Sequence, residues 1–188
     1  MAGKKSTDKI QNLSIEDIIE MIKVTSNTRD RAILLLLFKT GIRVGELINL
    51  NLENVSLDNG TISMPMSMKK EQRDIYFDEE CGEALKAWIS VRVSNGNNAL
   101  FIDNGDRLKD NFVRTIVKET ANRSGIQASV TPHAFRRAFA YHLTFKGCNM
   151  NIIYTLLGHA KSHDDSYIQL PPEQVRAEYL KAIPKLGV

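Results

Sequence analysis

The sequence predicts a mainly α-helical domain with a small antiparallel β-sheet near its middle, an α+β fold. Three observations favour this class. Apolar residues recur at helical spacing through most of the 188 residues, and capping residues, glycines or prolines stand where these stretches begin and end. Only two short runs, residues 61–66 and 73–77, have the composition of strands. A hydrophobic content of 43% suffices for one core, so residues 13–188 are expected to form a single domain behind a flexible N-terminal segment, residues 1–12.

The first two helices follow from their caps. Residues 13–24 carry apolar side chains every three or four positions, and Ser14 forms a capping box with Asp17 three residues later. Residues 28–41 are nearly all apolar after the first turn, which predicts a helix surrounded by other elements. Gly41 is expected to end this central helix.

A short third helix and a hairpin come next. The helix is predicted within residues 42–50. The strand-like runs 61–66 and 73–77 are expected to pair with each other, because the polar stretch between them, residues 67–72, reads as the turn of a hairpin.

Five more helices are predicted after the hairpin. Thr131 is expected to cap one of them, with Pro132 in its first turn, and Gly158 is expected to end the next. The five ranges are 78–92, 108–125, 131–143, 150–158 and 171–183.

The last helix carries an apolar stripe. Val175, Tyr179 and Ile183 recur every four residues, so they share one face. We expect this stripe to dock on a neighbouring protomer, the alternative being that it packs on the chain's own core.

Composition excludes several classes of protein. The longest apolar run, residues 32–38, is too short to span a bilayer, and the N-terminus has no apolar segment of a secretory signal. Cys81 and Cys148 show neither metal-ligand nor disulfide-framework spacing, which suits the reduced cytoplasm. A net charge of +3 is compatible with nucleic-acid binding only if the basic residues are clustered.

The stretch 131–143 is unusual because it places basic residues in an otherwise apolar helix. His133 and Arg136 lie three apart and near the amino end, where unpaired N–H groups favour an anion. An arginine fork matches phosphate oxygens, so the pattern indicates a phosphate site. The alternative is a solvated basic face with a hydrogen-bonded histidine.

Three sequence blocks together resemble the tyrosine recombinase (phage integrase) family. They are TGIRVGEL at 40–47, TPHAFRRAFA at 131–140, and LLGH at 156–159 followed by Tyr167. In the second block the family usually has leucine before the arginine and often histidine after it, where this chain has Phe135 and Arg137. The resemblance implies the fold of a tyrosine recombinase catalytic domain.

The resemblance also implies a chemistry. Tyr167 would attack a DNA phosphodiester, and Arg43 and Arg136 would hold its non-bridging oxygens. Fixed guanidinium groups suit this step because negative charge accumulates on those oxygens. Ionising a tyrosine at pH 7 costs about 4 kcal/mol, which nearby cations largely offset.

The remaining family positions map onto four residue positions of this chain. His133 and His159 would position the phosphate and help to move protons, and Glu46 would orient a catalytic side chain. A lysine of the hairpin would protonate the leaving 5′ oxygen. Lys69 fits the position better than Lys70, although a hairpin lysine is usually just a solvated turn residue.

Other polar residues have weaker claims. Arg137, Lys70 and Lys146 are candidates for contacts with the DNA backbone, or are simply polar flanks. The two histidines and two aspartates within residues 159–165 could suggest a metal site, but such short clusters are more often polar loops. Neither a metal nor a cofactor is expected.

The expected function is therefore that of a site-specific DNA recombinase of the integrase, invertase or resolvase type. It would act in the cytoplasm on double-stranded DNA as a homotetramer bound to two sites. The alternatives are a type IB topoisomerase-like enzyme that nicks and closes DNA, and a helical DNA-binding regulator without catalysis. Two departures from the family are a His159-to-Tyr167 spacing one residue shorter than usual and only about a dozen residues before the first helix. The latter leaves open a fragment or a naturally short recombinase.

Overall fold

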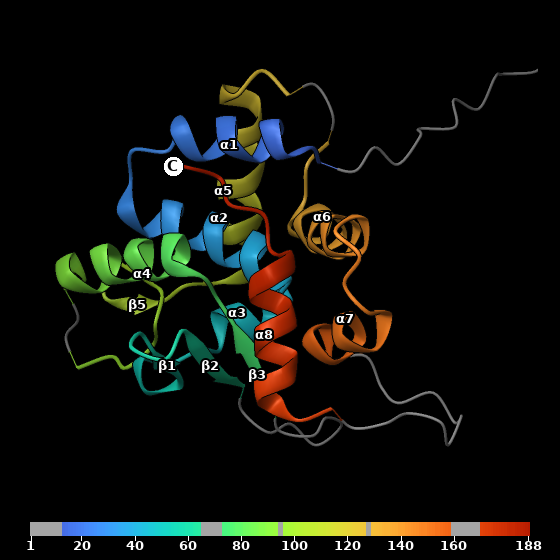
Figure 1. The fold of residues 1–188 in the computed structure, drawn as a ribbon. Helices are drawn as coiled ribbons and strands as arrows, with labels where there is room; N and C mark the ends of the chain where they lie inside the picture. Colours follow the sequence, from blue (N-terminus) through green and yellow to red (C-terminus); the bar gives the residue numbers. More distant parts are fainter. Residues whose placement is uncertain (1–12, 65–72, 94–95, 127–128, 159–169) are drawn as a thin grey trace, which may run out of the picture.

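The computed structural model describes residues 13–64, 73–93, 96–126, 129–158 and 170–188. Within them the chain is mainly α-helical, with two small antiparallel sheets (Figure 1). In chain order the elements are α1 (Ile15–Lys23), α2 (Thr28–Thr40), α3 (Val44–Ile48), the 3-10 helix η1 (Leu52–Asn54), β1 (Val55–Ser56), β2 (Thr61–Met64), β3 (Arg73–Tyr76), α4 (Glu79–Val91), β4 (Ile102–Asp103), β5 (Asp106–Arg107), α5 (Asp110–Arg123), α6 (Pro132–Phe145), α7 (Met150–Leu157) and α8 (Pro172–Ala182).

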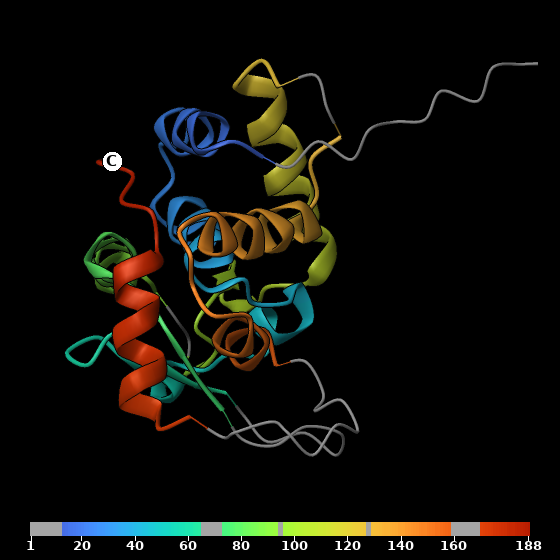
Figure 2. The ribbon, with the colours of Figure 1, turned by 45° about the vertical axis from the view of Figure 1, so that its right-hand side comes forward.

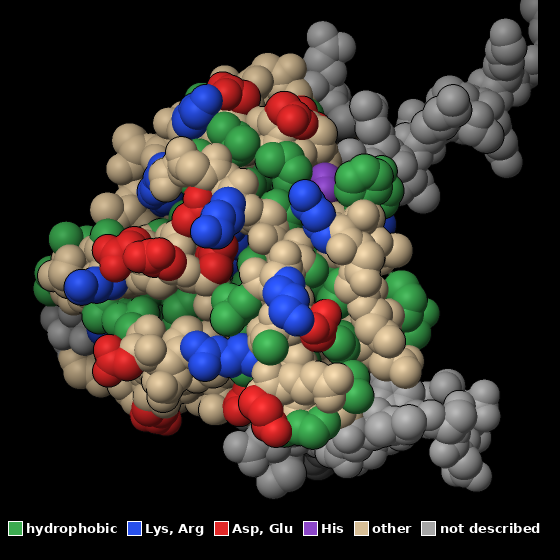
Figure 3. Space-filling model, viewed as in Figure 1, with side chains coloured by type: hydrophobic (Ala, Val, Ile, Leu, Met, Phe, Trp, Pro, Cys, Tyr) green, Lys and Arg blue, Asp and Glu red, His purple; other side chains and the backbone are tan. Residues whose placement is uncertain are grey.

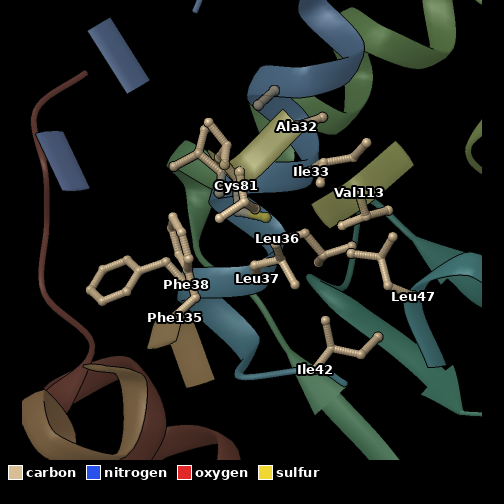
Figure 4. Close-up of a cluster of buried hydrophobic side chains, with 14 of the residues drawn as sticks. Ala32, Ile33, Leu36, Leu37, Phe38, Ile42, Leu47, Cys81, Val113 and Phe135 are labelled. Carbon is tan, nitrogen blue, oxygen red and sulfur yellow. The ribbon is translucent and has the colours of Figure 1, made fainter. Parts of the chain in front are cut away.

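Helix α2 is the centre of the fold, as its apolar sequence predicts. Every residue from Ala32 to Thr40 is buried. Helix α4 packs on one side of α2 and α6 on the other (Figure 1). Side chains of α3, α4, α5 and α6 meet those of α2 in the core, among them Leu47, Cys81, Val113 and Phe135 (Figure 4).

The local signals at the helix ends are confirmed, with one exception. The capping box of Ser14 and Asp17 is present, and Gly41 and Gly158 end their helices in the left-handed conformation. The prediction for Thr131 is wrong in part. Thr131 occupies the N-cap position of α6, but its side chain makes no capping hydrogen bond. The N–H of Ala134, in the first turn, donates to the main-chain oxygen of Thr131 instead.

The predicted hairpin is formed by β2 and β3. They pair antiparallel from Thr61 opposite Tyr76 to Met64 opposite Arg73. The small antiparallel sheet is therefore confirmed, and the structure adds β1 at its edge and a second sheet, the β4–β5 pair, that the sequence did not predict. Strands of two residues have no alternation that a sequence pattern could reveal.

The apolar stripe of α8 packs inside its own chain, so the prediction that it docks on a neighbouring protomer is wrong. Val175, Tyr179 and Ile183 are buried in a second cluster formed with α6 and α7. The Tyr179 hydroxyl donates to the main-chain oxygen of Lys39, 2.9 Å away, which ties α8 to the end of α2. The two aromatic rings of Phe139 and Tyr179 meet where the helices cross.

A buried lysine fastens the segment after α8. Lys39 is fully buried and its Nζ donates to Asp78 and Glu80, both at 2.5 Å, and to the main-chain oxygen of Pro184 at 2.7 Å. The Glu80 carboxylate also accepts from the main-chain N–H of Leu186. The chain therefore runs from α8 back along the core toward α1 (Figures 1 and 2).

Two general expectations are also met in the described residues. Cys81 and Cys148 are both free and buried. None of the helices described combines the length and the apolar character needed to cross a bilayer.

Candidate functional site

Arg136 lies inside the protein at the junction of three helices. It projects from α6, is only 6% exposed, and donates from Nη1 to the Gly41 oxygen at 2.6 Å and from Nη2 to the Leu157 oxygen at 2.7 Å. Those carbonyls belong to the ends of α2 and α7, where main-chain oxygens lack helical partners and the helix dipole is negative. The alternative of a solvated basic face is therefore wrong for Arg136.

Arg43 reaches the same point from another element. It is the N-cap residue of α3, and its Nη1 donates to the Leu157 oxygen at 3.2 Å. Arg43 and Arg136, 93 positions apart in the sequence, thus share one acceptor atom. The pKa of Arg136 falls to about 10, chiefly because burial disfavours the charged form and secondly because Arg43 is near, while Glu46 acts in the opposite direction. Arg136 remains charged at neutral pH.

Glu46 joins the arginines together. Its Oε1 accepts from Arg43 Nη1 at 3.3 Å, and its Oε2 accepts from the main-chain N–H of Arg43 and from Arg73 Nη2, both at 3.1 Å. Three guanidinium groups and one carboxylate give these four side chains a net charge of +2. Such a cluster suits a phosphate group.

Arg73 is a member of the arginine cluster that sequence reasoning missed. It is the first residue of β3 and stands 27 positions after Glu46. Only the pairing of β3 with β2 brings it beside α3, and no local pattern encodes that approach. The one available signal was an arginine directly after the turn that holds the candidate lysines.

Two glycines allow the helix ends to converge on the cluster. Gly41 and Gly158 have φ angles of 61° and 59°, a region that side chains disfavour. A Cβ on Gly41 would lie 2.6 Å from the ring of Phe139, and one on Gly158 would lie 2.5 Å from Cζ of Arg73. These contacts explain physically why the TGIR and LLGH segments contain glycine.

The other residues of α6 separate by position. His133 is exposed in the first turn, three residues before Arg136. Arg137 is half-buried, and its Nε lacks a hydrogen-bond partner in the described part of the chain. Lys146 is exposed at the far end, about 15 Å along the helix from Arg136, so it lies outside the cluster. His142 stabilises the fold, because its Nε2 donates to the Leu13 oxygen at 3.1 Å.

A hollow of about 650 Å³ lies at that far end of α6. It is lined mainly by residues of α1 and α6 and by Pro184 and Lys185, and the arginine cluster is not part of it.

On the face seen in Figure 3, basic and acidic side chains are mixed, and neither charge forms a continuous patch.

Several predicted site residues fall outside the described ranges. They are Lys69, Lys70, His159, Tyr167 and the polar cluster at 159–165. The segments that hold them adjoin described parts of the cluster in sequence. Residues 65–72 connect β2 with Arg73, and His159 directly follows Gly158.

Comparison with known proteins identifies the family. The model of the phage integrase family matches residues 9–169. The chain is 36% identical over 162 residues to tyrosine recombinase XerC of Thermodesulfovibrio yellowstonii, which covers 79% of this chain and 54% of that protein. It is 33% identical over 156 residues to tyrosine recombinase XerA of Pyrococcus furiosus, which covers 80% of this chain and 54% of that protein.

The fold agrees with these relatives. The crystal structure of XerA recombinase superposes with a TM-score of 0.77 at 30% identity and covers 93% of this chain and 66% of its own. The XerH site-specific recombinase bound to its difH substrate superposes with a TM-score of 0.67 at 24% identity, covering 81% and 49%. The chain spans about half the length of the curated relatives it matches. A matched family model over most of the chain and an arginine cluster built from the family's blocks lead to one conclusion: this chain belongs to the phage integrase family.

Proposed function

We propose that this chain is the catalytic domain of a site-specific DNA recombinase that cleaves and rejoins strands through a 3′-phosphotyrosine intermediate. The observation that carries the proposal is the convergence of Arg43 and Arg136 on the Leu157 oxygen. Arg136 donates to two main-chain oxygens, and the one carboxylate of the cluster, Glu46, offsets only part of the positive charge. The cluster therefore keeps positive charge for an anion.

The arginines would act on the transition state of phosphoryl transfer. Arg136 is held by two main-chain oxygens before any substrate binds, so it needs no reorganisation when charge builds up on the phosphate oxygens. The side chain of Arg43 is 37% exposed, which leaves part of its guanidinium accessible from outside. Arg136 would therefore contact the non-bridging oxygens from a buried position, and Arg43 from an accessible one.

The bond changes follow from the residue types. Tyr167 Oη would bond to phosphorus and lose its proton, and the bond from phosphorus to the 5′ oxygen would break. Lys69 would give a proton to that oxygen, with Lys70 as the alternative. Attack by a 5′ hydroxyl of another strand would then release Tyr167 without an external energy source. His133 and His159 would position the phosphate and carry protons, and Glu46 would orient Arg43.

The partner in this proposal is double-stranded DNA. Solved relatives support it by their descriptions, since XerH is bound to a difH substrate and the Tn1549 transposon integrase is in complex with circular intermediate DNA. We further propose that the protein acts in the cytoplasm, as a homotetramer on two DNA sites. Arg137, Lys70 and Lys146 remain candidates for backbone contacts.

Trapping a covalent adduct tests the proposal. A pool of duplexes with a randomised centre and a nick nearby is incubated with the protein, because cleavage beside a nick releases a short 5′-hydroxyl fragment and makes the step irreversible. We expect an adduct on a denaturing gel, and peptide mass after nuclease digestion should place the DNA on Tyr167. Tyr167→Phe should bind the recovered sequence with unchanged affinity and form no adduct, because it lacks only the attacking oxygen.

Other outcomes separate the alternatives. DNA binding without any adduct would point to a regulator. An adduct on Tyr154 or Tyr179 would overturn the assignment of the nucleophile. An enzyme that relaxes supercoils but exchanges no strands between two duplexes carrying the recovered sequence would be a nicking and closing enzyme.

A further inference from the structure

Arg73 is the third guanidinium of the cluster, and the proposed chemistry does not use it. Its side chain is only 12% exposed, and Nη2 donates to Glu46 Oε2 at 3.1 Å. Its Nε is buried without a hydrogen-bond partner among the described residues. Placing a buried charge beside two like charges costs free energy. The position of Arg73 therefore calls for an interaction or a function that offsets this cost.

Arg73 lies against the turn at Leu157 and Gly158, which the other two arginines also contact. Its guanidinium packs on Gly158, where an added Cβ would lie 2.5 Å from Cζ and 2.6 Å from Nη1. The preceding residue, Leu157, supplies the oxygen to which Arg43 and Arg136 donate. Arg73 is also close enough to contribute to the lowered pKa of Arg136, after burial and Arg43. Arg73 therefore contacts the turn and the carboxylate but not the shared acceptor.

Among the described residues, Arg43 and Arg73 both donate to the Glu46 carboxylate. The Arg43 guanidinium makes its hydrogen bonds to described residues through Nη1 alone, one to Leu157 and one to Glu46 at 3.3 Å. The other two nitrogens of the Arg43 guanidinium, Nε and Nη2, make no hydrogen bond within the described part of the chain. If Arg73 were lost, Arg43 would compete with one guanidinium fewer for the Glu46 carboxylate. A bidentate pair between Arg43 and Glu46 would then use the nitrogens that a phosphate needs.

We propose that Arg73 is a positioning residue that holds Glu46 and thereby keeps the Arg43 fork free for the DNA phosphate. The catalytic part of this inference rests on the proposed function, whereas the link from Arg73 through Glu46 to Arg43 is a property of the free protein. The two parts can therefore be tested separately.

The structural part is tested by NMR of the arginine side chains in the free protein. The Arg43 Nε–H signal, assigned by its loss in Arg43→Lys, should shift in Arg73→Gln, because Arg43 then interacts more strongly with the Glu46 carboxylate. Arg107→Gln is the matched control. Arg107 also comes from a strand and binds the end of α3, through the oxygens of Ile48 and Leu50, but it does not touch Glu46. The control should leave the Arg43 signal in place, and an unmoved signal in Arg73→Gln would overturn the inference.

The catalytic part is tested by single-turnover cleavage of the sequence recovered by adduct trapping. Arg73→Gln should slow adduct formation on the order of tenfold. Its affinity for DNA should stay within about threefold of wild type, since Arg73 is not assigned a phosphate contact. Arg73→Lys keeps a charge and one donor for Glu46 and should recover most of the rate. A merely structural role would weaken binding and rate together and would not be rescued by lysine.

A double variant decides whether Arg73 acts through Glu46. If it does, Arg73→Gln combined with Glu46→Gln should cleave no more slowly than Glu46→Gln alone, because both remove the same link. Additive losses would assign Arg73 an independent action and contradict the proposal. If wild type forms no adduct at all, the proposed function fails, and the NMR comparison still decides the link between the three side chains.

Discussion

At the scale of single residues, Gly158 is a position where one added carbon should be costly. It combines a left-handed φ of 59° with the contact to Arg73 described above. Gly158→Ala should lower the free energy of unfolding by about 1–2 kcal/mol from the backbone alone and by more because Arg73 must move. Urea unfolding measures this loss.

Gly147 provides the matched control for Gly158. Its φ is 79°, but a Cβ there would meet nothing within 4 Å. Gly147→Ala therefore carries the backbone strain without the displaced arginine. Equal losses in the two variants would show that the contact between Gly158 and Arg73 has no energetic importance.

At the scale of elements, the attachment of the C-terminal segment to α4 should make stability depend on acid pH. Burial by itself raises the pKa of Glu80, but the hydrogen bonds from Lys39 and from the main chain of Leu186 and Gly187 outweigh it, so the pKa is lowered on balance. A carboxyl group with a lowered pKa stabilises the fold above its unfolded pKa of about 4.3, and this contribution is lost as pH falls through the folded value.

The comparison of two glutamates on α4 tests this dependence. Between pH 6 and pH 3, wild type should lose stability more steeply than Glu80→Gln, because the variant has no carboxyl group to protonate there. Glu83→Gln changes an exposed residue on the same helix and should follow wild type. Parallel curves for wild type and Glu80→Gln, measured by urea unfolding across this range, would contradict the role of the buried contact.

At the scale of the whole molecule, the proposed reaction should not need a divalent metal. In the proposed reaction Arg43 and Arg136, which belong to a cluster of net charge +2, would neutralise the charge of the phosphate. A metal ion does this in other phosphoryl-transfer enzymes. Adduct formation in EDTA should therefore match that in Mg²⁺ within about threefold, a range too small for loss of a catalytic metal. Complete loss in EDTA that Mg²⁺ restores would point to a different mechanism.

Much of this molecule could be predicted from local sequence. The ends of α2 and α7, the hairpin of β2 and β3, and the pair of Arg43 and Glu46 on α3 all depend on residues within a few positions of one another. What could not be predicted depends on distant partners. The approach of Arg73 to Glu46 needs the register of a hairpin, and the burial of the α8 stripe needs the surface offered by α6 and α7. An apolar stripe predicts that one face of a helix is buried, but it does not predict which surface buries it.

The shared acceptor of the two arginines has a consequence for how this site withstands mutation. The oxygen of Leu157 is a main-chain atom, so it is present whatever side chain occupies that position. No single substitution at residue 157 can delete it, in contrast to an anchor made by an aspartate or a glutamine. The path of the backbone therefore supplies the acceptor that the two guanidinium groups share, and a substitution at residue 157 can disturb it only by shifting the end of α7.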